Sequence, residues 1–153
     1  MYFAAVILLM LVLPAVCVGA EVIRSPHTTP VIFLIEKWFV FWAVGVRIFG
    51  AGVSKLIRPQ FTAGAIFGIQ DRGSYPIVRE VGFGNLSIGL LGICSMFHVS
   101  WVVPAAIVGG TFYGLAGLGH ASQKNKNAKE YAAMISDGFA FLVLLILVID
   151  SLS

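Results

Sequence analysis

The chain has 153 residues, of which 59% are hydrophobic and only 11% are charged, and its formal net charge is +3. Soluble domains carry about 25% charged residues, so this composition excludes an ordinary soluble domain and indicates an integral membrane protein. A chain of this length forms one compact unit, and we expect residues 1–153 to be a single membrane domain. The positive charge is too small and scattered to indicate nucleic acid, so the expected surroundings are a lipid bilayer.

The first apolar run, residues 2–20, is just long enough to span a bilayer. A secretory signal peptide is the alternative interpretation, because Val18-Gly19-Ala20 resembles a cleavage site. The run lacks the positively charged residues that begin a signal peptide. We therefore predict a retained transmembrane helix, in which Pro14 can introduce a kink.

A polar linker at residues 21–30 precedes a second apolar run at 31–57. A helix of that length covers about 40 Å, more than the bilayer core of about 30 Å, so it must tilt or protrude. Trp38 and Trp42 are typical of the membrane interface. Arg47 lies deeper, where an arginine is costly enough to need a partner.

Residues 58–79 are neither clearly spanning nor clearly soluble. On a helix, Phe61, Ala65, Ile66 and Ile69 share one face. This pattern predicts a short helix that lies at the membrane surface.

The third spanning helix is predicted at about 77–97. Small and polar residues occur on both of its faces, which predicts close neighbours on both and makes it the central helix of the bundle. On a helical wheel, one face holds Glu80, Gly84, Ser87, Cys94 and His98, and the other holds Gly82, Asn85, Gly89, Gly92 and Met96.

The fourth and fifth helices are predicted at about 102–121 and 132–152, joined by the hydrophilic loop 122–130. Gly110 and Gly114 have the GxxxG spacing that permits close helix packing in membranes. The predicted fold is thus an all-α polytopic membrane bundle with five transmembrane helices and one short interfacial helix.

Lysine and arginine are concentrated in two of the predicted connections, 58–79 and 122–130. The positive-inside rule places these connections and the N-terminus in the cytoplasm and the C-terminus outside.

Three short strings resemble a known family: Glu80-Val-Gly with Asn85-Leu and Gly89, then Gly119-His120, then Ser136-Asp137. They resemble a family of uncharacterised bacterial integral membrane proteins related to the DoxX-like group, over about Trp42 to Val148. The resemblance implies a four-helix core to which the first helix is added, in the bacterial inner membrane. Together with the charge distribution, this makes the expected C-terminus periplasmic. It implies no established activity, although some DoxX-like relatives are linked to quinones and membrane redox assemblies.

Glu80, His120 and Asp137 lie on three helices near the predicted cytoplasmic face. One hypothesis is a structural clamp in which cations neutralise the carboxylates, because charges within a membrane must be paired. The other is a ligand site, such as a pocket for a quinone head group. We predict direct contact within a polar cluster that comprises Glu80, His120, Asp137, Arg79, Arg47, Asn85 and Tyr113.

We expect helix packing at Gly82, Gly84, Gly89, Gly110 and Gly114. We find no nucleophile elbow, phosphate loop or metal motif, so we assign no catalytic or metal-binding residue. His98 and His27 lack a paired spacing that would suggest a haem or metal site.

Two functions are consistent with the sequence. The first is a non-catalytic accessory or scaffold subunit, with protein partners in the membrane or a second copy of the chain. The alternative is a redox-associated protein whose pocket near the cytoplasmic face holds a quinone or lipid. The sequence favours a protein that is not an enzyme but does not decide the matter.

Overall fold

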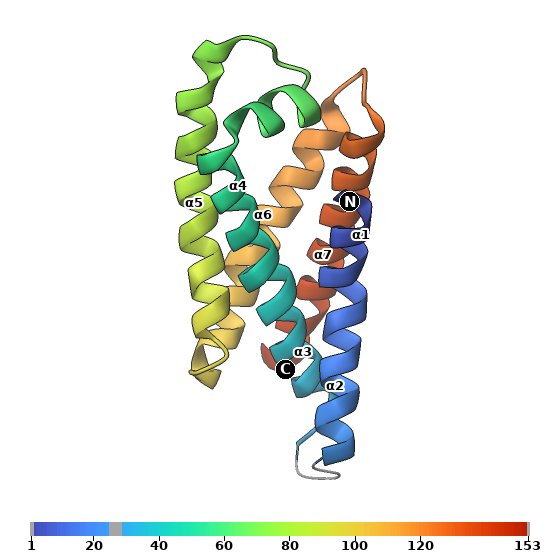
Figure 1. Ribbon diagram of the computed structural model, residues 1–153. Coiled ribbons are helices and arrows are strands. Elements are labelled where there is room, and N and C mark those ends of the chain that lie inside the picture. Colours follow the sequence, from blue (N-terminus) through green and yellow to red (C-terminus); the bar gives the residue numbers. More distant parts are fainter. Residues whose placement is uncertain (1, 25–28, 153) are drawn as a thin grey trace.

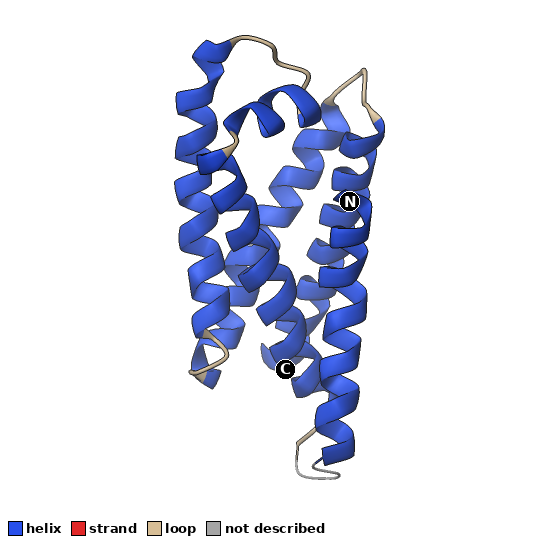
Figure 2. Cartoon of the chain, in the orientation of Figure 1, coloured by secondary structure: helices blue, strands red, loops and turns tan. Residues whose placement is uncertain are grey.

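The computed structural model describes residues 2–24 and 29–152. All regular secondary structure within these ranges is helical, and the long helices form an elongated bundle (Figures 1 and 2). His27 and part of the predicted 21–30 linker lie outside the described residues.

Two of the long helices contain π-helical stretches. The first comprises α1 (Tyr2–Ile7), η1 (Leu8–Val12) and α2 (Leu13–Arg24). The second comprises α3 (Val31–Phe39), η2 (Val40–Ile48) and α4 (Phe49–Ile57). We call these two continuous helices the first helix and the second helix.

The other three long helices are α5 (Tyr75–Cys94), α6 (Val102–Ser122) and α7 (Ala128–Leu152). Short helical turns lie in two of the connections. Before α5 these are η3 (Phe61–Ile66) and η4 (Arg72–Ser74), and before α6 it is η5 (Val99–Trp101). The five predicted long helices are present, with ends that differ from the predictions by up to four residues.

Within the described residues, four helices are long and apolar enough to cross a membrane, at Phe3–Arg24, Arg72–Cys94, Val99–Ser122 and Ala128–Leu152. The second helix is not among them. It carries four charged residues, Glu36, Lys37, Arg47 and Lys55.

Prolines explain several helix boundaries. The π-helical stretch η1 ends at Val12, two residues before Pro14. Proline has no N–H, and its ring clashes with the preceding turn of a regular helix. The second helix ends at Ile57, because Arg58 precedes Pro59 and adopts a non-helical φ of −132°. Pro76 lies in the first turn of α5, where a missing N–H costs nothing.

The helix α7 begins at Ala128, four residues before its predicted start, because of a capping box. Asn127 Oδ1 accepts hydrogen bonds from the backbone N–H groups of Lys129 and Glu130, at 2.9 and 3.1 Å. Glu130 Oε2 in turn accepts one from the Asn127 N–H at 3.0 Å. These reciprocal bonds satisfy donors that a helix start leaves open.

The second helix occupies the centre of the bundle, and the prediction that α5 is central is wrong within this chain. The second helix contacts the first helix, α5, α6 and α7, whereas α5 lies at one side (Figure 1). Val40, Ala43 and Val44 of the second helix are completely buried.

One face of α5 approaches the second helix backbone to backbone. A Cβ atom at Gly92 would lie 2.5 Å from the Gly45 backbone nitrogen, and one at Gly82 would lie 3.2 Å from the Gly52 carbonyl oxygen. Gly89 makes an equally close approach to Phe49. Glycines therefore let these two backbones pack without intervening side chains.

The opposite face of α5 packs against no other part of the described chain at Gly84, where a Cβ atom would meet nothing within 4 Å. Glu80 and Ser87 on that face are exposed. The expected close packing at Gly84 is thus absent from the described chain, because the second helix lies on the other side. Gly110 and Gly114 face α7, near Leu144 and Phe141 respectively.

Candidate ligand-binding cavity

A cavity of about 840 Å³ lies inside the half of the bundle that holds the connections 58–74 and 123–127 (Figure 1). All five long helices contribute to its wall, together with the turn η3. Its apolar lining includes Ala5, Leu9, Ile48, Ile66, Ile77, Val81 and Phe112, and its polar lining includes Arg47, Lys55, Thr62, Asn85, Tyr113, His120 and Asp137.

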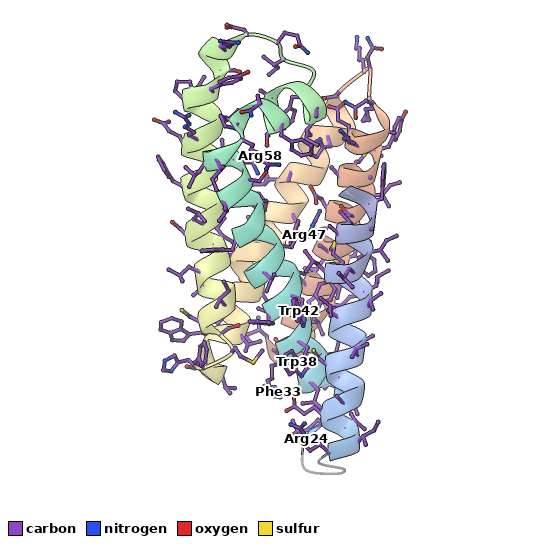
Figure 3. All side chains as sticks on the ribbon, viewed as in Figure 1. Arg24, Phe33, Trp38, Trp42, Arg47 and Arg58 are labelled. Atoms are coloured by element: carbon purple, nitrogen blue, oxygen red, sulfur yellow. The ribbon has the colours of Figure 1, made fainter. Side chains whose placement is uncertain are left out.

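Arg47 and Asp137 form an ion pair at this cavity. Arg47 Nη2 donates to Asp137 Oδ1 at 2.9 Å and to Ser136 Oγ at 2.8 Å. The guanidinium carbon also lies 5.0 Å from the centre of the Tyr113 ring. Arg47 lies in the π-helical stretch η2, about midway along the second helix (Figure 3). The predicted need for a partner is met by this carboxylate.

Lys55 faces Asn85 across the interface between the second helix and α5. In the amide orientation that satisfies both of its polar atoms, Asn85 accepts a hydrogen bond from Lys55 Nζ at 2.9 Å and donates one to the Val81 carbonyl at 3.1 Å. Asn85 is only 2% exposed. Its side chain therefore holds the lysine ammonium group at the cavity wall.

His120, near the end of α6, is buried against Phe67, which follows η3. The two rings are stacked, with centres 5.6 Å apart and planes 9° from parallel. Gly68, with a φ of +70°, ends this turn in a conformation that favours glycine. The 58–74 connection thereby brings Phe67 over His120.

Two buried polar atoms of this lining, Arg47 Nη1 and His120 Nδ1, have no hydrogen-bond partner among the described residues. The charged residues of the lining are two cations, Arg47 and Lys55, and one carboxylate, Asp137. The described wall thus carries one net positive charge. Buried polar atoms and charges are costly without partners, so this wall is suited to a ligand that accepts hydrogen bonds.

Five members of the predicted polar cluster line this one cavity: Arg47, Asn85, Tyr113, His120 and Asp137. Glu80 and Arg79 do not line it. Both are exposed on α5, because the face that turns inward is the one that carries Asn85. The expectation that Glu80 belongs to the cluster is therefore not met in the described chain.

Lys55 and Ser136 contribute to the cluster although the sequence did not suggest them. Lys55 follows Arg47 by eight residues, and that spacing places both on one helical face. Phe61, Ile66 and Ile69 also line the cavity. Of the apolar face predicted to lie on a membrane surface, Ile66 is buried, whereas Phe61 and Ile69 remain 36% and 44% exposed.

A smaller hollow of about 450 Å³ lies near the opposite end, lined in part by Glu21, Lys37 and Trp38. Here Glu21 accepts hydrogen bonds from Lys37 Nζ at 2.9 Å and from Trp38 Nε1 at 2.6 Å. Because these groups satisfy one another, this hollow offers less to a ligand than the larger cavity.

Apolar helices of spanning length, packed around an interior with paired charges, are compatible with a multi-pass membrane protein. The chain belongs to a family of unknown function, DUF6790, whose model matches residues 4–151. Comparisons with curated proteins and with solved structures give no match. The match confirms an uncharacterised family, whereas the relationship to the DoxX-like group rests on the sequence resemblance alone.

Proposed function

We propose that this protein is a membrane-embedded binding protein that holds a quinone or a lipid in the cavity between its helices. The observation that carries the proposal is the combination of a largely apolar cavity of about 840 Å³ with ionisable side chains at its wall. Ligand sites are commonly apolar pockets of about 300–1,000 Å³ with a few convergent polar groups. A membrane ligand has the matching form of an apolar body with a polar head group.

The arrangement of the polar groups supports binding in addition to a structural clamp. The Arg47–Asp137 pair is the clamp that the sequence suggested, and it accounts for one nitrogen of the guanidinium. It does not account for Arg47 Nη1 or His120 Nδ1, whose hydrogen-bonding capacity is unused among the described residues. A carbonyl or acidic head group would use it after a small rotation of these two side chains, because both atoms are now covered.

Filling the cavity tests this function. Ala116 lines the cavity on α6, whereas its neighbour Leu115 points outward and is 67% exposed. The parent protein, Ala116→Phe and the control Leu115→Phe would be purified in mild detergent, and their co-purified small molecules identified by native mass spectrometry and lipid extraction.

We expect a bound quinone or lipid in the parent and in Leu115→Phe, and at least a tenfold loss in Ala116→Phe at an unchanged melting temperature. Equal ligand content in all three proteins would contradict the proposal. If Ala116→Phe does not fold, Ala51→Leu blocks the same cavity from the second helix.

A scaffold role is the second candidate, and the outward face of α5 favours it. Glu80 and Ser87 are exposed on that face, and Gly84 leaves it without a bulky side chain. A photo-crosslinking residue at position 84 would then give discrete protein adducts in membranes, while the same residue at Leu142, 57% exposed on α7, would give fewer. Equal, diffuse labelling would count against a partner at α5.

We propose further that the second helix is a fifth span, which places the two termini on opposite sides of the membrane. It runs the length of the bundle between the other helices (Figure 1), and Asp137 pairs its deepest charge. Following the positive-inside rule and the family resemblance, we propose an inner membrane location with a cytoplasmic N-terminus. Reporter fusions at both ends test this topology, and termini on the same side would exclude five spans.

A further inference from the structure

We propose that the ligand of the large cavity carries a single negative charge on an apolar chain, as a long-chain carboxylate does. This inference rests on the proposed binding function and specifies the chemical class of the ligand. It follows from the charges and the hydrogen-bonding groups of the wall, taken together.

The first step concerns charge. Arg47 and Lys55 both line the cavity, and Asp137 is the single carboxylate in the described lining. Asp137 pairs with Arg47 at 2.9 Å, while the described partner of the Lys55 ammonium group is the neutral amide of Asn85. The described lining thus carries one more cationic charge than anionic charge, and the partly buried Lys55 ammonium group has no hydrogen-bonded anion among the described residues. A charge that is partly withdrawn from water gains from a counter-ion.

The second step concerns the donors. Lys55 has three N–H donors, of which Asn85 uses one. Arg47, on the same helical face, keeps a buried Nη1 without a hydrogen-bond partner among the described residues beside the cavity. His120, 8% exposed and also on the cavity wall, adds a ring nitrogen without a partner. Charge-assisted hydrogen bonds to a carboxylate are about twice as strong as bonds to a neutral acceptor.

A neutral quinone would use some of these donors but would leave the charge of Lys55 uncompensated. A carboxylate or phosphate ester would satisfy the donors and neutralise the charge together. These two head groups share one chemistry, a monoanion attached to an apolar chain, and they differ in their source: free fatty acid or anionic phospholipid.

Fluorescent binding measurements can separate these cases. The full-length protein would be placed in nanodiscs of zwitterionic phosphatidylcholine and titrated with cis-parinaric acid, at a pH at which the acid is ionised, and with its uncharged methyl ester. The variants are Lys55→Gln, which removes the charge, and Arg79→Gln, which removes a charge that does not line the cavity. Decylubiquinone and phosphatidylglycerol would serve as competitors.

We expect the acid to bind at least tenfold more tightly than the ester in the parent and in Arg79→Gln. In Lys55→Gln the ratio should fall to about one while the ester binds as before. Displacement by phosphatidylglycerol would indicate a phospholipid as the natural source, and resistance to it would indicate a free carboxylate.

Equal binding of acid and ester in the parent, or an unchanged ratio in Lys55→Gln, would overturn the anionic ligand. The binding function would survive that result if the ester or decylubiquinone still occupies the cavity. Failure of every probe to bind would overturn both. If Lys55→Gln does not fold, Lys55→Arg keeps the charge and should keep the ratio, and loss of the ratio there would contradict the inference.

Discussion

Charged side chains lie in different places in the two halves of the bundle. In the half that contains Arg24, Val31 and residues 94–102, the helices pack around an apolar core in which Val40, Val44, Ala105 and Leu144 are completely buried. Near its end Lys37 pairs with Glu21, and the buried Glu36 carboxylate accepts a hydrogen bond from Ser151 Oγ at 2.8 Å. In the other half the helices surround the cavity, and Arg47, Lys55 and Asp137 lie at its wall.

This difference shows which part of the molecule is built for packing and which for binding. In the first, closed half the carboxylates of Glu21 and Glu36 have hydrogen-bond partners within the described chain. The open half keeps Arg47, Lys55 and Asp137 at the cavity wall, although a charge that is withdrawn from water is costly. Because of that cost, these three residues are candidates for a functional role.

The largest expected effect comes from Gly92→Leu in the closed half. A Cβ atom there would lie 2.5 Å from the Gly45 backbone, and backbone of a packed helix cannot move aside as a side chain can. We expect little folded protein in detergent, measured by size-exclusion chromatography and thermal unfolding.

Substitutions at two further glycines should lower stability less than Gly92→Leu does. Gly114→Leu meets the Phe141 side chain, 2.9 Å from the new Cβ atom, and should cost about 1–3 kcal/mol because a ring can shift. Gly84→Leu meets nothing within 4 Å and should melt like the parent or slightly higher. A uniform effect at all three positions would show that the packing described here is wrong.

In the open half, Asp137→Ala should be severe because it leaves the Arg47 guanidinium unpaired inside the bundle. Removing one partner of a buried ion pair costs about 3–5 kcal/mol. The double variant Arg47→Met with Asp137→Ala should recover much of that stability, measured by thermal unfolding in detergent. Additive losses in the double variant would mean that the pair contributes no coupling.

An alanine-to-leucine change at two positions of α6, one in each half, provides a third comparison. Ala105→Leu enlarges a side chain that is 0% exposed in the closed core, so overpacking should cost about 1–3 kcal/mol. Ala116→Leu extends into the cavity and should leave the melting temperature unchanged or raised, while it reduces ligand binding. A large loss of stability at position 116 would argue against the cavity.

The helices could be predicted from the sequence because length and hydropathy decide them. Their arrangement could not, since the heptad spacing of Gly82, Gly89 and Asn85 permits packing on that face but does not specify which helix fills it. The prediction took the Glu80 and Gly84 face to be equally packed, and the described chain leaves it exposed. Small residues are compatible with a close neighbour without requiring one.

The polar cluster was predicted in part for a similar reason. Arg47, His120 and Asp137 stand out as ionisable residues within apolar runs, so their convergence was foreseeable. Lys55 was missed because its position near a predicted helix end suggested solvent. The connection 58–74 folds back over that end and places Phe67 and His120 together, which is tertiary information that no local pattern contains.

The smallest effect is expected in the closed half, at Glu21. There we compare the removal of one negative charge with the same removal at Asp137. Glu21 is 30% exposed at its side chain and pairs with Lys37, whereas Asp137 is buried at the cavity. Exposed ion pairs contribute about 0–1 kcal/mol, and Gln can still accept the hydrogen bond that Trp38 donates to Glu21. We therefore expect Glu21→Gln to lower the free energy of unfolding by less than about 1 kcal/mol, and Asp137→Asn by clearly more, in the same detergent.

Because each change replaces a carboxylate by an amide of nearly the same shape, a difference between them reports on burial and charge rather than on volume. Equal losses at the two sites would show that the halves do not differ electrostatically, which would remove the physical basis for assigning the binding function to the open half.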